Sequence, residues 1–180
     1  MRTKHYILYL FAALCCGLPS CVGEPDNNNK KEGLVKVGDH VPSFTVYDDE
    51  GNAFSSSEFA GKQSLLLFFD ITCGDCKREF PKIEQVWNSL KDSPDFCMVT
   101  ISRVTAGKTR EEDIEAVNDY WSSGFTMPKY FDNNRQVYNL FTEAYVPRVY
   151  LIDKQGIVRW MAIENVNLTA AELVEKIKSL

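Results

Sequence analysis

The chain has 180 residues, of which 44% are apolar, enough for one domain of ordinary size with a buried core and a short appendage. Lys and Arg number 20 against 25 Asp and Glu, so the formal net charge is −5. This acidic balance argues against a broad nucleic-acid-binding surface, which needs clustered positive charge. We therefore expect no nucleic-acid partner.

The N-terminus has the pattern of an export signal. Basic residues precede an apolar run over 6–14, which is shorter than the about 20 residues that span a membrane. Residues 18–21, Leu-Pro-Ser-Cys, resemble the bacterial lipobox, and the resemblance implies cleavage before Cys21 and lipid on its sulfur. We expect a signal peptide over 1–20 and a membrane-anchored lipoprotein of the bacterial cell envelope, facing the periplasm or the exterior. An ordinary cleaved signal, with Cys21 incidental, is the alternative.

Residues 21–36 are polar and predict a flexible linker, followed by a single domain over 37–180. The patterns of that domain predict, in chain order, a hairpin (43–47 and 53–54), a helical turn (57–62), a buried strand (64–69), a helix (73–90), a strand (96–102), a helix opened by Thr109 and stopped by Gly124, an extended segment (127–131), a helix after 132–134, a β-hairpin (146–161) and a closing helix opened by Thr169. This order predicts an α/β fold, with a central mixed sheet and helices on both faces.

Two cysteines lie where the buried strand 64–69 leads into the helix. Cys73 stands at the helix start, and Cys76 follows one turn later. Free N–H groups at a helix N-terminus stabilise an anion, so we expect Cys73 to act as a thiolate nucleophile. Cys76 is placed to close a disulfide with it. The motif predicts thiol–disulfide exchange, with the Cys73–Cys76 disulfide as the redox centre and no other cofactor.

Other uses of the cysteines fit less well. A structural zinc site needs four ligands, and besides this pair the mature chain offers only His40 and Cys97, which form no second pair. We therefore expect no metal. A purely structural disulfide is disfavoured because so short a loop gains little stability. Cys97 lies in an apolar strand, where we expect a small hydrophobic residue rather than a reactive thiol.

Three motifs in this order resemble the TlpA/ResA-like thiol–disulfide oxidoreductases of bacterial envelopes, which have a thioredoxin-like fold. They are Gly38-x-x-x-Pro42-x-Phe44, then Cys73-x-x-Cys76-Lys77-x-Glu79-Phe80-Pro81, then Val146-Pro147-x-x-x-Leu151-Ile152-Asp153-x-x-Gly156. The resemblance covers essentially the whole of 37–180. It implies an N-terminal β-hairpin and a central βα insertion, expected between Phe96 and Gly124.

The resemblance also implies residue roles. Cys73 matches the attacking cysteine and Cys76 the buried resolving cysteine. Pro147 matches a cis-proline that faces the pair and presents the Val146 backbone to substrate. Glu79 matches a family acidic residue near the pair. From helix spacing it lies one turn from Cys76 and could bias its proton, whereas the alternative is a solvated carboxylate on the helix surface.

The chain departs from the family pattern beside the cysteines, at three expected substrate-contacting positions. Thr72 stands where the family usually has Trp, so the apolar rim that receives substrate is reduced. Gly74 and Asp75 replace the common x-Pro dipeptide. The charge of Asp75 should destabilise a thiolate on Cys73 and favour the disulfide, which makes the pair a better reductant.

We therefore expect the pair to reduce disulfides in partner proteins and to be reset by a membrane thiol electron donor. Cytochrome c maturation and repair of envelope disulfides are two roles known in the family. A peroxiredoxin-like thiol peroxidase is one alternative, although its Pro-x-x-x-Thr-x-x-Cys setting is missing here. A non-catalytic thioredoxin-like module that binds a partner is another: the missing Trp permits it, and the retained cysteines argue against it.

Overall fold

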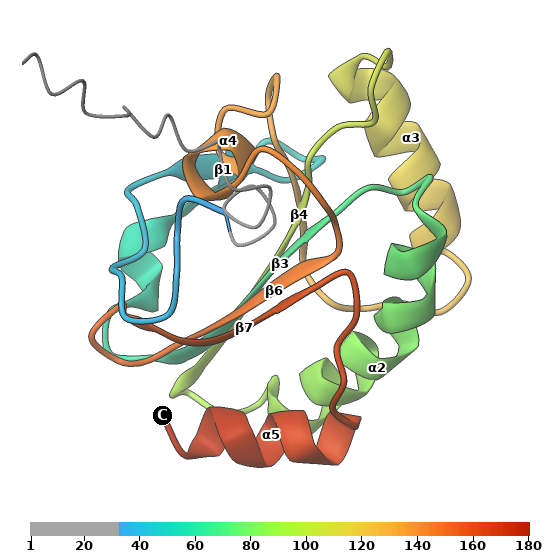
Figure 1. Ribbon diagram of the computed structural model, residues 1–180. Helices are drawn as coiled ribbons and strands as arrows, with labels where there is room; N and C mark the ends of the chain where they lie inside the picture. Colours follow the sequence, from blue (N-terminus) through green and yellow to red (C-terminus); the bar gives the residue numbers. More distant parts are fainter. Residues whose placement is uncertain (1–32) are drawn as a thin grey trace, which may run out of the picture.

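The computed structural model of the protein describes residues 33–180 (Figure 1). The predicted signal peptide (1–20), the lipidation site Cys21 and most of the predicted linker lie outside the described residues. The last residues of that linker belong to the folded domain, because the N–H groups of Leu34 and Val35 donate to the Phe141 carbonyl at 2.8 and 3.2 Å. The domain therefore begins before the predicted boundary at residue 37.

Position 33 requires a glycine. Its φ is +86°, a conformation that side chains disfavour, and a Cβ there would lie 2.8 Å from the Phe141 carbonyl oxygen.

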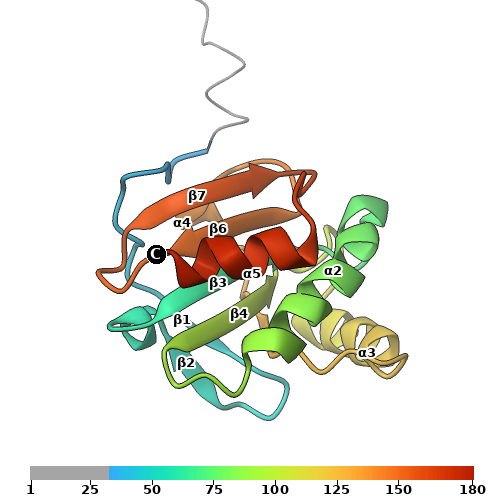
Figure 2. The same ribbon diagram turned by 90° about the horizontal axis from the view of Figure 1, so that it is seen from below.

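The strands form a seven-stranded sheet in the order β2-β1-β5-β4-β3-β6-β7 (Figures 1 and 2). Strands β3, β4 and β5 are parallel, and every other pairing is antiparallel. The elements are β1 (Thr45–Tyr47), β2 (Ala53–Ser55), the 3-10 helix η1 (Ser56–Phe59), β3 (Gln63–Phe69), α2 (Gly74–Leu90), β4 (Phe96–Ser102), α3 (Arg110–Trp121), β5 (Lys129–Phe131), α4 (Tyr138–Phe141), β6 (Arg148–Ile152), β7 (Val158–Ile163) and α5 (Ala170–Lys178). The predicted mixed sheet is confirmed.

Strand β3 is an interior strand of the sheet, between β4 and β6, and is buried on both faces, which explains its continuous apolar run. Successive side chains point to opposite faces. The Phe69 ring centroid lies 5.2 Å from that of Phe80 in α2, whereas the Phe68 centroid lies 4.9 Å from that of Phe141 in α4. Helices therefore cover both faces of the sheet, as predicted.

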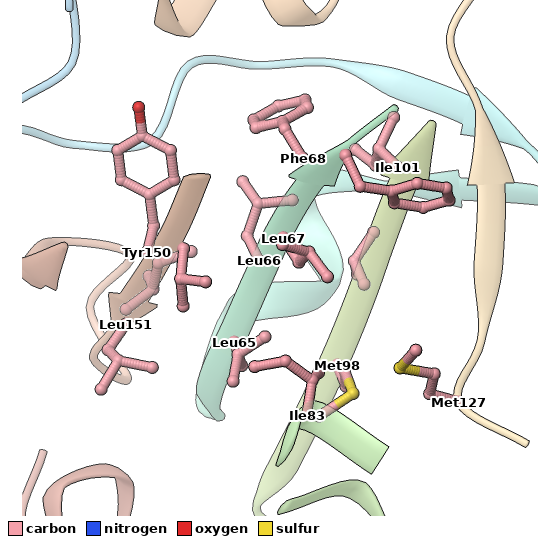
Figure 3. Packing of buried hydrophobic residues seen from close by; sticks show 14 of the residues in the cluster. Leu65, Leu66, Leu67, Phe68, Ile83, Met98, Ile101, Met127, Tyr150 and Leu151 are labelled. Carbon is pink, nitrogen blue, oxygen red and sulfur yellow. The ribbon is translucent and has the colours of Figure 1, made fainter. Parts of the chain in front are cut away.

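The two sides of the core are visible in the figures. Figure 3 shows Leu65 beside Ile83 of α2 and Met98 of β4. Figure 2 shows α2 and α5 on the near side of the sheet and α4 behind it.

The βα insertion consists of α3 and β5. Strand β4 pairs with β3 along its whole length, so it completes the β3–α2–β4 unit, and the added strand is β5 rather than 96–102. Trp121 of α3 stacks on Phe69 with centroids 5.3 Å apart. The Glu84 carboxylate of α2 accepts hydrogen bonds from the backbone N–H groups of Thr126 and Met127, both at 3.0 Å. The insertion is thereby fixed to the α2 side of the sheet.

The parallel strands β3, β4 and β5 end at the same edge of the sheet, and α2 begins there. Such an edge, where chain segments leave the strands in succession, is where α/β proteins commonly place their functional residues. Among residues 33–180, no helix is both long enough and apolar enough to cross a membrane.

Candidate active site

The cysteine pair lies at this edge, at the start of α2. Cys73 is the N-cap residue, and its N–H donates to the Asp70 carbonyl at 3.0 Å. Cys73 is partly exposed and Cys76 is fully buried, and both are free thiols. The predicted position of the pair is confirmed. A partner protein can reach Cys73 but not Cys76.

Cys76 is held in its protonated form. Burial raises the pKa of the Cys76 thiol well above its usual range, and the charge of the Asp70 carboxylate adds to the rise, as would a thiolate on Cys73. A backbone hydrogen bond with Asp70 opposes this shift without cancelling it. A protonated thiol is a poor nucleophile, so Cys76 stays inert until a proton is removed from it.

The segment between α4 and β6 faces the pair. The Val146–Pro147 peptide bond is cis, as the resemblance implies. The Cys73 thiol donates to the Val146 carbonyl at 3.6 Å, within the range for a sulfur donor. The Pro147 carbonyl accepts from the Glu164 N–H at 2.8 Å, which ties this segment to the end of β7. The structure brings Cys73 and Val146 together; their contact with substrate remains a prediction.

The residues that depart from the family pattern are also in place. Gly74 is the first residue of α2. The Thr72 N–H and hydroxyl both donate to the Asp70 carboxylate, at 2.9 and 2.7 Å. Asp75 forms an exposed ion pair with Arg78 one turn later. The negative charge of Asp75, which is expected to act on Cys73, is therefore partly neutralised by the Arg78 guanidinium.

Glu79 is buried rather than solvated, so the alternative of a surface carboxylate is wrong. Its carboxylate accepts from Lys82 Nζ at 2.8 Å and from the Val166 N–H at 3.4 Å. Lys82 Nζ also donates to the Val166 carbonyl. These contacts join α2 to the segment between β7 and α5. The effect of Glu79 on Cys76 remains a prediction.

The sequence analysis missed Asp70, the first residue after β3. It is buried and accepts hydrogen bonds from Thr72 and from the Thr105 hydroxyl at 2.8 Å, with Arg103 Nη2 3.5 Å away. Burial raises the pKa of the Asp70 carboxyl, but these hydrogen bonds and the Arg103 charge outweigh burial and hold the pKa below its usual value. The available signal was an acidic residue ending an apolar strand, three positions before Cys73.

With this geometry in view, similarity to known proteins can be assessed. Residues 37–161 match the AhpC/TSA family. The chain belongs to the AhpC/TSA family.

The thiol-disulfide oxidoreductase ResA of Geobacillus kaustophilus (strain HTA426) is 30% identical over 158 residues, which cover 87% of each chain. A putative protein disulfide isomerase from Bacteroides thetaiotaomicron matches with a TM-score of 0.72 and 28% identity, over 82% of this chain and 91% of that one. A putative thiol:disulfide interchange protein DsbE from Chlorobium tepidum matches with a TM-score of 0.67 and 21% identity, over 81% of this chain and 97% of that one. The predicted ResA-like family and thioredoxin-like fold are confirmed.

In this AhpC/TSA family member, a further buried carboxylate is connected to Asp70 through Thr105. Asp113 of α3 is fully buried and accepts from the Ser102 hydroxyl and from the Thr105 N–H at 3.3 Å. The Thr105 hydroxyl lies 2.8 Å from the Asp70 carboxylate and 3.3 Å from that of Asp113. Because a hydroxyl has one hydrogen to donate, the two carboxylates compete for it.

Arg103 completes this cluster. Its guanidinium donates to the Tyr138 hydroxyl at 3.3 Å and lies 5.3 Å from the centroid of the Tyr138 ring. The insertion and α4 therefore both meet the turn that carries the cysteines.

Cys97 lies apart from the pair. It pairs with Ser64 at the start of β3, whereas Cys73 follows the end of that strand. Burial raises the pKa of Cys97 to about 11, so the thiol is protonated at neutral pH, as expected for an apolar role. Within residues 33–180, no three His, Cys, Asp or Glu side chains converge as a metal site would require.

Proposed function

We propose that this protein is a thiol–disulfide oxidoreductase that exchanges disulfides with partner proteins through Cys73 and Cys76. One observation carries the proposal: an accessible thiol caps a helix beside the Val146 carbonyl, and a fully buried thiol follows one turn later. The similarity to ResA, DsbE and disulfide isomerase proteins supports the same activity.

The geometry suits two successive displacement steps. The Cys73 thiolate attacks one sulfur of a partner disulfide, forms a mixed disulfide and releases the other partner sulfur, which takes up a proton. Cys76 then loses its proton and attacks the Cys73 sulfur, which breaks the mixed disulfide and releases the second partner thiol. The partner gains two electrons and two protons, and the pair ends as a disulfide.

We propose that the pair works in the reductive direction in the bacterial envelope. The Asp70 carboxylate belongs to the turn that carries Cys73, and its charge disfavours a thiolate in the dithiol form, whereas the disulfide carries no charge. A reductant of this kind needs a membrane thiol electron donor to restore its dithiol. Lipid on Cys21 would hold the domain at the membrane near that donor. Apocytochromes and misbridged envelope proteins are the proposed partner classes.

An insulin reduction assay on the mature chain, with Cys21 replaced by Ser to remove the anchor, tests the activity. We expect Cys73→Ala to reduce the rate to background and Cys76→Ala to accumulate mixed disulfides. Activity retained by Cys73→Ala would overturn the mechanism. Equal rates for wild type and Cys76→Ser would favour a non-catalytic binding module. Peroxide consumption that survives Cys76→Ala would favour a thiol peroxidase.

The reduction potential of the pair tests the direction. Equilibration against glutathione or dithiothreitol buffers should give a value near that of thioredoxin, about −270 mV, or lower. A value near that of DsbA, about −120 mV, would identify an oxidant and contradict the reductive proposal.

A further inference from the structure

Asp70 holds the turn that carries the cysteines from two sides. Its carbonyl accepts the Cys73 N–H at 3.0 Å, and its carboxylate accepts the Thr72 N–H at 2.9 Å. The same residue acts on Cys76 through both its backbone and its charge. Asp70 is therefore connected to both cysteines, to Cys73 through the backbone and to the Cys76 thiol through its charge.

We propose that Asp70 is a positioning residue that makes the Cys73–Cys76 pair harder to reduce, and that the insertion adjusts its effect through the Thr105 hydroxyl. This inference rests on the proposed exchange function. A fixed negative charge beside the pair disfavours a thiolate in the dithiol form, whereas the disulfide carries no charge to oppose. Removing that charge should therefore favour reduction of the pair.

The charged and titratable groups around Asp70 come from four elements. Cys76 faces it from α2, and the N-cap residue Cys73 donates its N–H to the Asp70 carbonyl. Arg103 faces it from the end of β4 at 3.5 Å. Asp113 of α3 reaches it through Thr105. The fourth element, α4, reaches it through Arg103, which contacts Tyr138.

The cation beside Asp70 is more distant than the cation beside Glu79. The Arg103 contact is long, whereas Lys82 lies 2.8 Å from Glu79. The charge of Asp70 is therefore less completely neutralised than that of Glu79.

The Thr105 hydroxyl connects this charge to the insertion. At 2.8 Å from Asp70 and 3.3 Å from Asp113, its single hydrogen favours Asp70 in the structure described. A shift of α3 that moved this hydrogen to Asp113 would leave Asp70 with one donor fewer. Its charge would then act more strongly on the sulfurs. The insertion can thus alter the cysteine pair without contacting either cysteine.

The test measures the glutathione equilibrium of the pair in the mature chain carrying Cys21→Ser. Two glutathione thiols reduce the Cys73–Cys76 disulfide: its S–S bond breaks, that of glutathione disulfide forms, and two electrons and two protons pass to the pair. We expect Asp70→Asn, which keeps the size and the acceptor oxygen, to raise the equilibrium constant for reduction about tenfold, or about 30 mV.

Thr105→Val carries no change in charge and removes only the shared hydroxyl. It should lower the same constant about twofold, opposite in sign to Asp70→Asn, because Asp70 loses a donor. In a chain that already carries Asp70→Asn, Thr105→Val should not change the equilibrium constant for reduction. Asp153→Asn is the matched control, because Asp153 is a buried carboxylate beside the start of β3, at the end of the strand away from the cysteines, and it should change the constant less than twofold.

A purely structural role for Asp70 would loosen the turn in both variants and move both constants in the same direction. That outcome, or a change of less than twofold in Asp70→Asn, would overturn the proposal. If Asp70→Asn does not fold by circular dichroism, the pH profile of Cys73 alkylation by iodoacetamide decides. We expect Thr105→Val to shift its midpoint upward, and an unshifted midpoint overturns the inference. A wild-type chain that reaches no equilibrium with glutathione would instead reject the proposed function.

Discussion

Two buried carboxylates flank the first turns of α2, and they are held in different ways. Glu79 forms an ion pair with Lys82 and binds the Val166 N–H, on the side of the segment between β7 and α5. Asp70 receives hydroxyl donors and one distant guanidinium, on the side of the insertion. The comparison shows that the Glu79 carboxylate has a close cation as its partner, whereas the Asp70 carboxylate is held mainly by hydroxyl donors.

Substitutions at the two carboxylates should therefore have different effects. On the Asp70 side, changes should alter the cysteine chemistry. On the Glu79 side, changes should alter stability and leave the chemistry largely intact. Four predictions test this difference between the two sides, and they are ordered by the size of the expected effect.

The largest effect on stability is expected at Asp113, which supports the Asp70 side from α3. Asp113→Ala leaves the Ser102 hydroxyl and the Thr105 N–H buried without an acceptor and should lower the free energy of unfolding by about 3 kcal/mol. Urea unfolding measures this loss. The exposed neighbour Glu111 is the control, and Glu111→Ala should cost less than about 0.5 kcal/mol. If Asp113→Ala leaves the free energy of unfolding almost unchanged, this cluster does not stabilise the segment that contains Thr105.

The next effect is expected on the other side of α2. Glu79→Ala leaves the partly buried Lys82 ammonium and the Val166 N–H without their acceptor and should cost about 2 kcal/mol by urea unfolding. Its glutathione equilibrium should match wild type within about twofold. A large change in that equilibrium with little loss of stability would reverse the division and support the role that the family resemblance implies.

The acid limb of the stability curve should distinguish Asp70 from the buried carboxylate of Asp132. Its folded pKa is lowered, so its contribution is present above the unfolded value of about 3.9 and is lost as pH falls through the folded pKa. Asp70→Asn should therefore be about 1 kcal/mol less stable than wild type at pH 7, and the gap should close below about pH 4. Thermal or urea unfolding from pH 2 to 7 measures this gap.

Asp132 gives the control of opposite sign. Burial raises the pKa of its carboxyl despite hydrogen bonds from the N–H groups of Val137 and Tyr138. A raised pKa means that the ionised carboxylate destabilises the folded state, and this destabilisation disappears as pH falls. Asp132→Asn should therefore lose stability relative to wild type on acidification. If both variants follow the same acid limb, the assignment of opposite shifts is wrong.

The smallest effect is expected at the exposed pair of Asp75 and Arg78. Arg78→Gln should change the free energy of unfolding by less than about 0.5 kcal/mol, because both side chains are well solvated. It should also shift the glutathione equilibrium less than about twofold. A larger shift, reduced by added salt, would return Asp75 to the position of main redox determinant that the sequence predicts.

Much of the site could be predicted from the sequence because its signals are local. A buried strand, a Cys-x-x-Cys and an amphipathic helix adjoin in the chain, so Cys73 could be placed at the helix start. The Val146–Pro147 pair was expected opposite because the family resemblance supplied it. The capping boxes of Thr109 and Thr169 formed as predicted, since each needs only a carboxylate three residues later.

The missed features depend on contacts that are distant in the sequence. Thr105 meets Asp70 across 35 positions because β3 and β4 run parallel in a register that aligns Phe69 with Ser102. Helix spacing placed Glu79 one turn from Cys76 but left a solvated surface carboxylate open as the alternative, since nothing local shows that the chain returns past it at Val166. Charge neutralisation depends on such three-dimensional neighbours, so the sequence could not show how completely each of the two carboxylates is neutralised.

The attachment of Leu34 and Val35 to α4 has a consequence for the reach of the protein. It fixes the point at which the chain leaves the domain, immediately before the segment that leads to Pro147. With lipid on Cys21, only twelve residue steps separate the membrane surface from Gly33 (33 − 21 = 12), or at most about 40 Å of extended chain. The domain would then stay within that distance of the bilayer, and only partner disulfides at the same distance could be reduced.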